Sequence, residues 1–179
     1  LQRHNPSSGL WVRHAEVDEA SILSNADVRS LYQLGNGEIW AGMNERGVAV
    51  LDPQLRPIGQ ILTNDSATGQ ASGAALFKGG VVGGITQSTD GSVWVGSDSG
   101  IYQFSPQRKL LRHYSAGQGR ARRMLATGDG SVWAGTQDGV YRRPAGGEGF
   151  DRLRLQGGGV LNGNVNALAE STDGSIWVG

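Results

Sequence analysis

The sequence contains no cysteine, only three histidines, and only two lysines among its 16 basic residues. Without cysteine, disulfides, zinc–thiolate sites, iron–sulfur clusters and cysteine nucleophiles are excluded. The 16 acidic residues match the basic ones, so the formal net charge is zero and no overall field attracts nucleic acid. No apolar run approaches the roughly 20 residues of a membrane-spanning helix, and no signal peptide is evident. The 179 residues themselves therefore offer neither a nucleic-acid-binding charge nor a membrane span.

Glycine, by contrast, is abundant, with 30 among 179 residues, and it recurs beside Asp, Asn and Trp as turn residues do. Four segments repeat one pattern: an Asx-Gly pair, a polar residue, a branched aliphatic residue, Trp, a small apolar residue and Gly. These segments are 32–42, 86–96, 125–135 and 169–179. The residues at equivalent positions are Trp40, Trp94, Trp133 and Trp177, and Gly42, Gly96, Gly135 and Gly179. Intervals of roughly 40 to 50 residues without helical periodicity indicate the blades of a β-propeller.

Each unit is interpreted as four short strands. In the third unit the innermost strand covers about 123–127, and Asp129-Gly130 is predicted to form a type I′ turn, whose two central residues need a positive φ. The remaining strands of that unit are expected at about 131–136, 140–143 and 150–155. A sheet of this size cannot bury both faces alone and has to stack on neighbours. We therefore predict an all-β fold, a β-propeller segment of about four blades, each a four-stranded antiparallel meander.

The repeat divides one propeller region, 1–179, into blades with a half blade at each end. The predicted units are a partial blade 1–25, a blade 26–64 with an insert 65–83, a blade 84–116, a blade 117–160 and a partial blade 161–179. In the first half blade, Trp11 is interpreted as the counterpart of Tyr102 and Tyr141. The insert, rich in Gly, Ala and Ser, is expected to be disordered or a flexible hairpin. Both chain ends look cut, so an open arc from a longer protein is favoured over a closed ring of four blades, the low end for propellers.

The repeated residues have a structural interpretation. A Trp in the second strand is expected to fill the layer between adjacent blades, burying of the order of 200 Å², and the Gly two residues later lets a neighbouring backbone approach. The recurring carboxylates Asp90, Asp129 and Asp173 raise the alternative of calcium binding. A calcium loop needs several oxygen ligands, whereas each turn supplies one, and Asn36 takes the place of Asp in the first unit. A hairpin turn is therefore preferred, and no metal or cofactor is predicted.

The segments 165–179 ("VNALAESTDGSIWVG") and 124–143 ("MLATGDGSVWAGTQDGVYRR") resemble the two-component regulator propeller repeat, and the resemblance extends over 9–179. The resemblance implies seven-bladed propellers, often two in tandem, in the periplasmic sensing region of bacterial membrane receptors. It also implies that a small β-sandwich, a transmembrane helix and an output module follow. That output module is commonly a histidine kinase or a diguanylate cyclase.

Some positions depart from that family pattern. Ser97 and Met43 replace the Thr that usually follows Trp-x-Gly, and Ala49 replaces the aromatic residue of the next strand, so the first unit is the most degraded. A rival pattern is the Asp-box of sialidase-like propellers. Here Gly91 follows Asp90 directly, so the box is one residue short, and the Asp-box belongs to a different turn.

The candidate ligand site lies in the loops where the repeats disagree. Loops that lead into the innermost strand share one propeller face with the turn after the Trp strand, and ligands usually bind there, whereas the Asx-Gly turns lie on the opposite face. The arginine-rich segment 117–123 is either a site for a carboxylate, a phosphate or an acidic sugar, or a solvated loop. The candidate ligand-binding residues are Asn44, Arg46, Asp98, Arg120, Arg122, Gln137, Asp138, Asn162 and Asn164.

These features predict a non-catalytic ligand-sensing segment of a bacterial two-component or diguanylate cyclase receptor, located in the periplasm. The resemblance implies that the ligand is an oligosaccharide; another small ligand is the other expectation. A receptor homodimer is also expected, with a membrane contact made only through a segment outside this chain. The alternatives are a propeller enzyme acting on polysaccharides, either a lyase or a glycosidase, and a protein-binding scaffold. His4, His14 and His113 stand at no metal-ligand spacing, and no G-x-S-x-G elbow or P-loop occurs, so no catalytic residue is predicted.

Overall fold

The computed structural model describes residues 2–13, 22–61, 80–115 and 120–179, and within these ranges every regular element is a β-strand. Blade A contains β3 (Val28–Gln33), β4 (Ile39–Met43), β5 (Val48–Leu51) and β6 (Pro57–Ile61). Blade B contains β7 (Val82–Gln87), β8 (Val93–Ser97), β9 (Gly100–Phe104) and β10 (Leu110–Tyr114). Blade C contains β11 (Arg123–Ala126), β12 (Val132–Thr136), β13 (Gly139–Arg143) and β14 (Asp151–Arg152). The N-terminal hairpin is β1 (Gln2–His4) and β2 (Trp11–Arg13), and the C-terminal hairpin is β15 (Leu168–Glu170) and β16 (Ile176–Val178).

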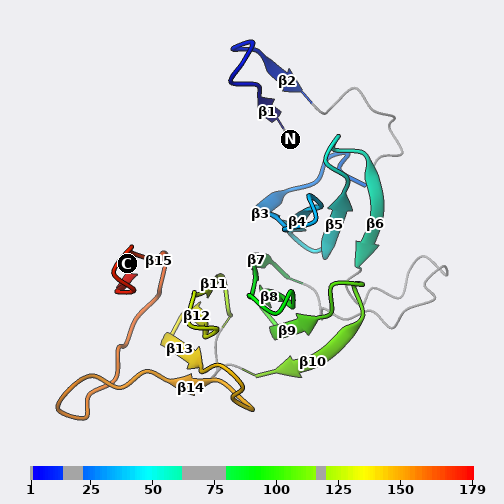
Figure 1. Cartoon of the computed structure of the whole chain (residues 1–179). Helices are drawn as coiled ribbons and strands as arrows, with labels where there is room; N and C mark the ends of the chain where they lie inside the picture. The colour runs from blue at the N-terminus through cyan, green and yellow to red at the C-terminus, as the bar shows by residue number, and fades with distance from the viewer. Residues whose placement is uncertain (1, 14–21, 62–79, 116–119) are drawn as a thin grey trace.

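Each blade is an antiparallel meander whose strands pair in chain order. Figure 1 shows the sheets fanned along an arc, with β3, β7, β11 and β15 toward its inner side. The chain is thus a segment of a β-propeller, and the fold class predicted from the repeat is confirmed. The two terminal hairpins belong to separate sheets, so the chain's own ends do not close a four-bladed ring. In the described ranges, no helix combines the length and apolar character that crossing a membrane requires.

The predicted insert 65–83 falls mostly outside the described residues. Residues 80–83 at its end are described, and β7 begins there at Val82. Gly83 lies close to the next blade, since a Cβ on this residue would be 3.0 Å from the carbonyl oxygen of Arg122. The end of the segment therefore belongs to the innermost strand of blade B.

The N-terminal hairpin corrects one assignment made from the sequence. The N–H groups of Asn5, Asp52 and Ser105 each close a turn by donating to a carbonyl four or five residues later. Each of these residues is followed by proline, and in blades A and B the turn joins the third strand to the fourth. Trp11 follows the first of these turns and therefore lies on a fourth strand. Its interpretation as the counterpart of the third-strand tyrosines is wrong.

The Asx-Gly turns are not the type I′ turns that we predicted. Gly91 N donates to Ser88 O at 2.9 Å and Ser88 N donates to Ser92 O at 3.0 Å, which leaves a three-residue loop. The φ of Gly91 is 82°, whereas the φ of Asp90 is not positive. The turn is therefore type I followed by a left-handed glycine. The same two backbone bonds close the turns at Gly37, Gly130 and Gly174.

Tryptophans of the second strand lie between blades. Trp40 is fully buried and meets Phe104 of blade B edge-on, with ring centroids 5.8 Å apart. Trp94 is also buried and makes the same type of contact with Phe150 of blade C at 5.8 Å. Trp177, in the C-terminal hairpin, is 68% exposed. Burial of these rings therefore depends on a following blade.

The glycines two residues after these tryptophans lie where blades come closest. A Cβ on Gly42, Gly96 or Gly135 would lie within 2.7 Å of an atom of the following blade or of the segment leading into it. Real Cβ atoms do not approach other atoms so closely, so only glycine fits at these positions. The Trp and Gly of each repeat thus serve one purpose, the close stacking of successive sheets.

Candidate functional site

Hairpin ends of the blades lie on two opposite edges of the propeller segment. The loop edge is formed by the turns between second and third strands and by the segments that lead into the innermost strands. The turns are residues 44–47, 98–99 and 137–138, and the lead-in segments are residues 80–81, 120–122 and 162–166. The Asx edge is formed by the turns 36–37, 90–91, 129–130 and 173–174. All nine candidate ligand-binding residues belong to the loop edge.

Backbone hydrogen bonds join the two kinds of segment on the loop edge across each blade junction. Ala121 N donates to Ser97 O at 3.0 Å between blades B and C. Val165 N donates to Thr136 O at 2.9 Å at the next junction. Between blades A and B, Glu45 N donates to Gly80 O at 2.9 Å. A turn of one blade is therefore fixed to the lead-in segment of the next.

The junction between blades B and C carries a cluster of charges. Asp98 Oδ1 accepts a hydrogen bond from Arg122 Nε at 3.1 Å, and Arg120 Nε lies 3.7 Å from Asp98 Oδ2. Val81 N also donates to this carboxylate, at 3.3 Å. The side chain of Arg120 is 49% exposed and that of Arg122 is 35% exposed. Two guanidinium groups thus share one carboxylate, which leaves a surplus positive charge facing solvent.

The junction after blade C is built around Asp138 and an arginine that sequence reasoning missed. Arg152 Nη2 donates to Asn162 Oδ1 at 2.8 Å and to the carbonyl oxygen of Asp138. The Asp138 carboxylate accepts hydrogen bonds from Thr136 Oγ1 at 2.6 Å and from the Tyr141 hydroxyl at 3.0 Å. Arg152 could have been found from the strand pairing, since it is the fourth-strand partner of Tyr141.

The pKa values of Asp138 and Tyr141 at this junction are shifted in opposite directions. Burial raises the pKa of the Asp138 carboxyl, but the hydrogen bonds from Thr136 and Tyr141 and the charge of Arg152 outweigh it, so this pKa lies below its ordinary value. Burial, together with hydrogen bonding to the Asp138 carboxylate, raises the pKa of the Tyr141 hydroxyl. Asp138 is therefore a charged acceptor and Tyr141 a neutral donor.

The remaining candidate residues are distributed along the same edge. Asn44 forms a bridge with Val81 of the following blade. Arg46 Nη1 donates to Ser24 O at 2.8 Å, and Asn164 Nδ2 donates to Asn166 Oδ1 at 2.8 Å. Gln137 is exposed. The structure thus brings Asp98 together with Arg120 and Arg122. Arg152 connects Asp138 with Asn162. The nine candidate residues as a whole are spread over three successive blade junctions.

On the Asx edge the aspartates are occupied within their own turns. Asp129 accepts hydrogen bonds from Thr127 Oγ1 at 2.5 Å and from Ser131 N at 2.9 Å. The Thr127 bond and then the Ser131 bond lower the pKa of Asp129 to about 2. Asp173 is held in the same way by Ser171 and Ser175, with its pKa lowered to about 2. Each carboxylate caps its own hairpin turn, and the described residues contain no group of three His, Cys, Asp or Glu side chains placed to hold a metal ion.

No hydrogen bond or ion pair joins either of the two described histidines to Asp98 or Asp138, although His113 reaches Ser99 in the turn beside Asp98. His4 lies against the Trp11 ring, with centroids 5.0 Å apart. His113 stacks on Tyr102 with centroids 4.3 Å apart, and its Nε2 lies 3.0 Å from Ser99 O. His14 lies outside the described residues. Neither described imidazole thus stands within the charge clusters at Asp98 and Asp138.

The fold and the repeated blade junctions place this chain in the class of β-propeller segments. The turns on its Asx edge repeat one pattern, whereas the residues on its loop edge differ from blade to blade. No family model matches the chain, and no curated protein matches it significantly. Solved structures do match. One is the extracellular domain of a protein assigned as a hybrid two component system from B. thetaiotaomicron, with a TM-score of 0.75 and 21% identity. A second, from the same organism, is the extracellular domain of a protein assigned as a one component system, with a TM-score of 0.72 and 14% identity.

Both alignments cover 99% of this chain and 23% of the other, so the chain spans about a quarter of each of these proteins. A third similar structure is virginiamycin B lyase from Staphylococcus aureus, with a TM-score of 0.67 and 14% identity over 99% of this chain and 55% of the lyase. Propellers with such different roles share this fold. At these identities the likeness establishes the fold, and function has to be argued from the site.

Proposed function

We propose that this chain is a non-catalytic ligand-sensing propeller segment of a bacterial signalling receptor, located outside the cytoplasm, in the periplasm. The observation that carries the proposal is the Asp98, Arg120 and Arg122 cluster at the junction of blades B and C. It lies on the edge where the repeats disagree, and it offers a half-exposed guanidinium beside a neighbouring carboxylate. The likeness to extracellular domains of proteins assigned as two component and one component systems supports the same role.

The ligand class follows from the chemistry of the loop edge. Guanidinium groups bind carboxylates with two parallel hydrogen bonds, and amide side chains both donate to and accept from hydroxyl groups. Arg120 offers the first type of group, and Asn162 and Asn164 offer the second. An oligosaccharide, in particular one with acidic sugars, fits this combination.

Binding at a blade junction supplies a mechanism for signalling. A ligand that contacts Arg120 and the turn at Asp98 touches two blades at once, because the turn belongs to blade B and the lead-in segment to blade C. Ligand binding therefore favours one relative orientation of the two blades over others. A rigid-body change of this kind is then passed to an output module beyond this segment.

The proposal is tested by isothermal titration calorimetry of the purified chain with oligogalacturonate and with a neutral cello-oligosaccharide of the same length. We expect the acidic sugar to bind more tightly, and Arg120→Ala to weaken its binding by about tenfold, the loss of one charge-assisted contact. Lys109→Ala, which removes an exposed cation from a turn between third and fourth strands, is the matched control and leaves binding unchanged.

Two outcomes would contradict the proposal. One is the absence of binding by any sugar of a wider acidic and neutral panel. The other is cleavage of a bound sugar by the wild-type chain that Arg120→Ala abolishes, which would favour the enzyme alternative. Chromatography of the sugar after incubation separates binding from turnover.

A further inference from the structure

One hydrogen bond between the outermost strand and the loop edge recurs in blades A, B and C. Its donor is a side chain of the fourth strand. Its acceptor is the carbonyl oxygen of the residue just before Gly47, Gly100 or Gly139, at the end of the turn between second and third strands. The pairs are Gln60 Nε2 with Arg46 O at 3.0 Å in blade A, His113 Nε2 with Ser99 O at 3.0 Å in blade B, and Arg152 Nη2 with Asp138 O in blade C. The donor thus changes from amide to imidazole to guanidinium, while the acceptor stays the same backbone group.

Strand pairing shows that the three donors occupy one position of the repeat. Each donor lies opposite the third-strand residue that is two positions after the glycine. The facing pairs are Gln60 with Ala49, His113 with Tyr102 and Arg152 with Tyr141. The contact therefore follows from the register of the third and fourth strands, and it holds each loop-edge turn to the outermost strand of its own blade.

In blade B this contact acts on the turn that carries Asp98. The partner of His113 is a carbonyl oxygen, which can only accept, so Nε2 carries the hydrogen of the bond. The imidazole stacks on the Tyr102 ring with centroids 4.3 Å apart. Gly100 leaves room for it, since a Cβ on this residue would lie 2.7 Å from His113 Nε2. Ring stacking and the glycine thus place the imidazole at the carbonyl of Ser99.

The side chain of Ser99 is held as well as its carbonyl group. Its hydroxyl lies 2.9 Å from the Tyr102 hydroxyl and 3.0 Å from the Ser97 hydroxyl. Ser99 directly follows Asp98, whose carboxylate accepts a hydrogen bond from one arginine of the cluster and lies close to the other. The backbone orientation at Ser99 therefore helps to set the direction in which the Asp98 side chain leaves the turn.

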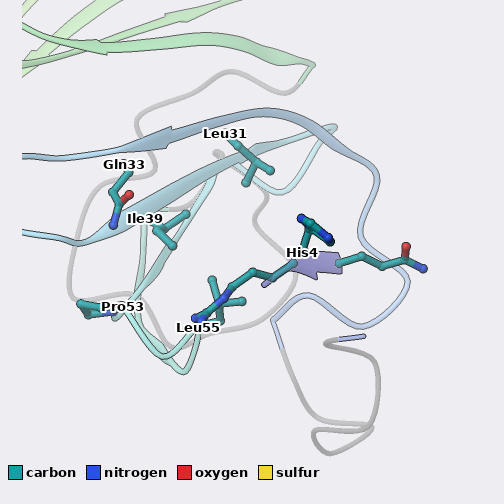
Figure 2. Close-up of a pocket in the computed structure, with 8 residues that line it drawn as sticks. His4, Leu31, Gln33, Ile39, Pro53 and Leu55 are labelled. Atoms are coloured by element: carbon teal, nitrogen blue, oxygen red, sulfur yellow. The ribbon is translucent and has the colours of Figure 1, made fainter. Parts of the chain in front are cut away.

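The cavity shown in Figure 2 is separate from these turns. It has a volume of about 450 Å³, lies between the N-terminal hairpin and blade A, and has Leu31, Ile39 and Leu55 among its lining residues. None of its lining residues belongs to the loop edge. The Asp98 cluster is therefore held by its own turn and by the following lead-in segment, so contacts that fix the turn matter for the cluster.

We propose that His113 is a positioning residue of the loop edge, which fixes the Ser99 carbonyl and thereby orients Asp98 toward the arginines of the proposed ligand site. Gln60 and Arg152 perform the same task for the turns of blades A and C. The outermost strand thus contributes to ligand affinity without contacting the ligand. The effect on affinity rests on the proposed sensing function, whereas the effect on the turn does not.

The first measurement uses NMR of the isotope-labelled chain without ligand, above about pH 8, where an imidazole is uncharged. Long-range proton–nitrogen correlations should show the Nε2–H tautomer for His113, and His113→Phe identifies its signals among the three histidines. The carbonyl carbon shift of Ser99 should change in His113→Ala and His113→Phe. It should stay near the wild-type value in His113→Gln, because an amide donates at this position in blade A. The Nδ1–H tautomer, or an unchanged Ser99 shift in His113→Ala, would overturn the proposal.

The second measurement is the affinity for oligogalacturonate by isothermal titration calorimetry. His113→Ala should weaken binding by about threefold, the order expected for one hydrogen bond. His113→Phe keeps a ring beside Tyr102 but has no donor, so it should bind as weakly as His113→Ala. His113→Gln lacks the ring but has a donor, so it should recover the wild-type affinity. Leu111→Ala, at an exposed residue of the same strand, is the matched control and should bind as the wild type does.

Wild-type affinity in His113→Phe would assign the effect to ring stacking and would overturn the proposal. So would a His113→Gln variant that binds no better than His113→Ala. Circular dichroism of each variant checks that its blades remain folded. Absence of binding by the wild type would overturn the sensing function and the affinity part of this proposal, whereas the tautomer and the Ser99 shifts would still decide whether His113 positions the turn.

Discussion

The indole N–H of Trp94 donates a hydrogen bond to Ser88 Oγ at 2.9 Å. Ser88 Oγ in turn donates to Asp90 Oδ1 at 2.6 Å. The ring that fills the layer between blades B and C is thereby tied to the turn of its own blade. Ser88 and Asp90 therefore belong to a structural network in which these polar groups already have partners.

Removing the Trp94 ring should be costly, because it is 1% exposed and fills the layer between two sheets. We expect Trp94→Ala to lower the free energy of unfolding by about 3–5 kcal/mol. Trp11→Ala, at a ring that is 68% exposed, should change it by less than about 0.5 kcal/mol. Urea unfolding followed by circular dichroism measures both. Equal effects of the two substitutions would contradict the assignment of Trp94 to the inter-blade core.

A methyl group at Gly96 should force blades B and C apart. The added Cβ would lie closer than a van der Waals contact to the carbonyl oxygen of Ala121, which is backbone and cannot move aside. We expect Gly96→Ala to destabilise the chain by about 1–3 kcal/mol. Gly128→Ala provides the control, because a Cβ there meets nothing within 4 Å. Thermal unfolding of the two variants should separate them clearly.

Acid should weaken the Asx turns in a defined pH window. The folded-state pKa of Asp129 is about 2, below the ordinary value of 3.8, because Thr127 and Ser131 donate hydrogen bonds to the carboxylate. A depressed pKa contributes stability that is present above the unfolded value and is lost as the pH falls from about 4 through 2. The contribution is small because Asp129 is more than half exposed.

Thr127→Val tests this linkage, because it removes the largest cause of the Asp129 shift while keeping the shape of the side chain. The pKa of Asp129 should rise toward its ordinary value, so the variant should lose less stability than the wild type between about pH 4 and 2. Urea midpoints measured over this range provide the comparison. An unchanged pH dependence would show that the Thr127 bond does not control the turn.

The two arginines at the Asp98 cluster should separate into a structural and a binding residue. Arg122 makes the shorter contact with Asp98 and is the less exposed of the two. A double-mutant cycle of Arg122→Ala with Asp98→Ala should give a coupling of about 0.5–1 kcal/mol, as for a partly exposed ion pair. Arg120→Ala should leave stability within about 0.5 kcal/mol of the wild type. A larger effect of Arg120→Ala would make it unsuitable as a probe of ligand binding.

Much of the blade architecture can be predicted from the sequence because the repeat encodes local structure. The Asx-Gly pair marks the turn, and the alternation around Trp94 sets which residues face the next blade. The type of the turn could not be predicted from the dipeptide alone, because it depends on whether Ser88 pairs with Ser92 across it. Proline after Asn5, Asp52 and Ser105 was the signal that would have placed Trp11 correctly.

The candidate site is less predictable, since it is made of contacts between residues far apart in the chain. Arg122 and Asp98, 3.1 Å apart between blades B and C, show no sequence pattern that joins them. Arg152 reaches Asn162 only because the fourth strand ends beside the following lead-in segment. Which polar groups remain available to a ligand therefore depends on how the blades stack.

The most direct test of the sensing proposal is an NMR titration of the isotope-labelled chain with oligogalacturonate. We expect chemical-shift changes at the backbone amides of Asp98, Arg120, Arg122 and their neighbours on the loop edge. The amides of Gly91, Gly130 and Gly174 on the opposite edge should not move. Shifts confined to the Asx edge, or no shift at any amide, would contradict a ligand site at the Asp98 cluster.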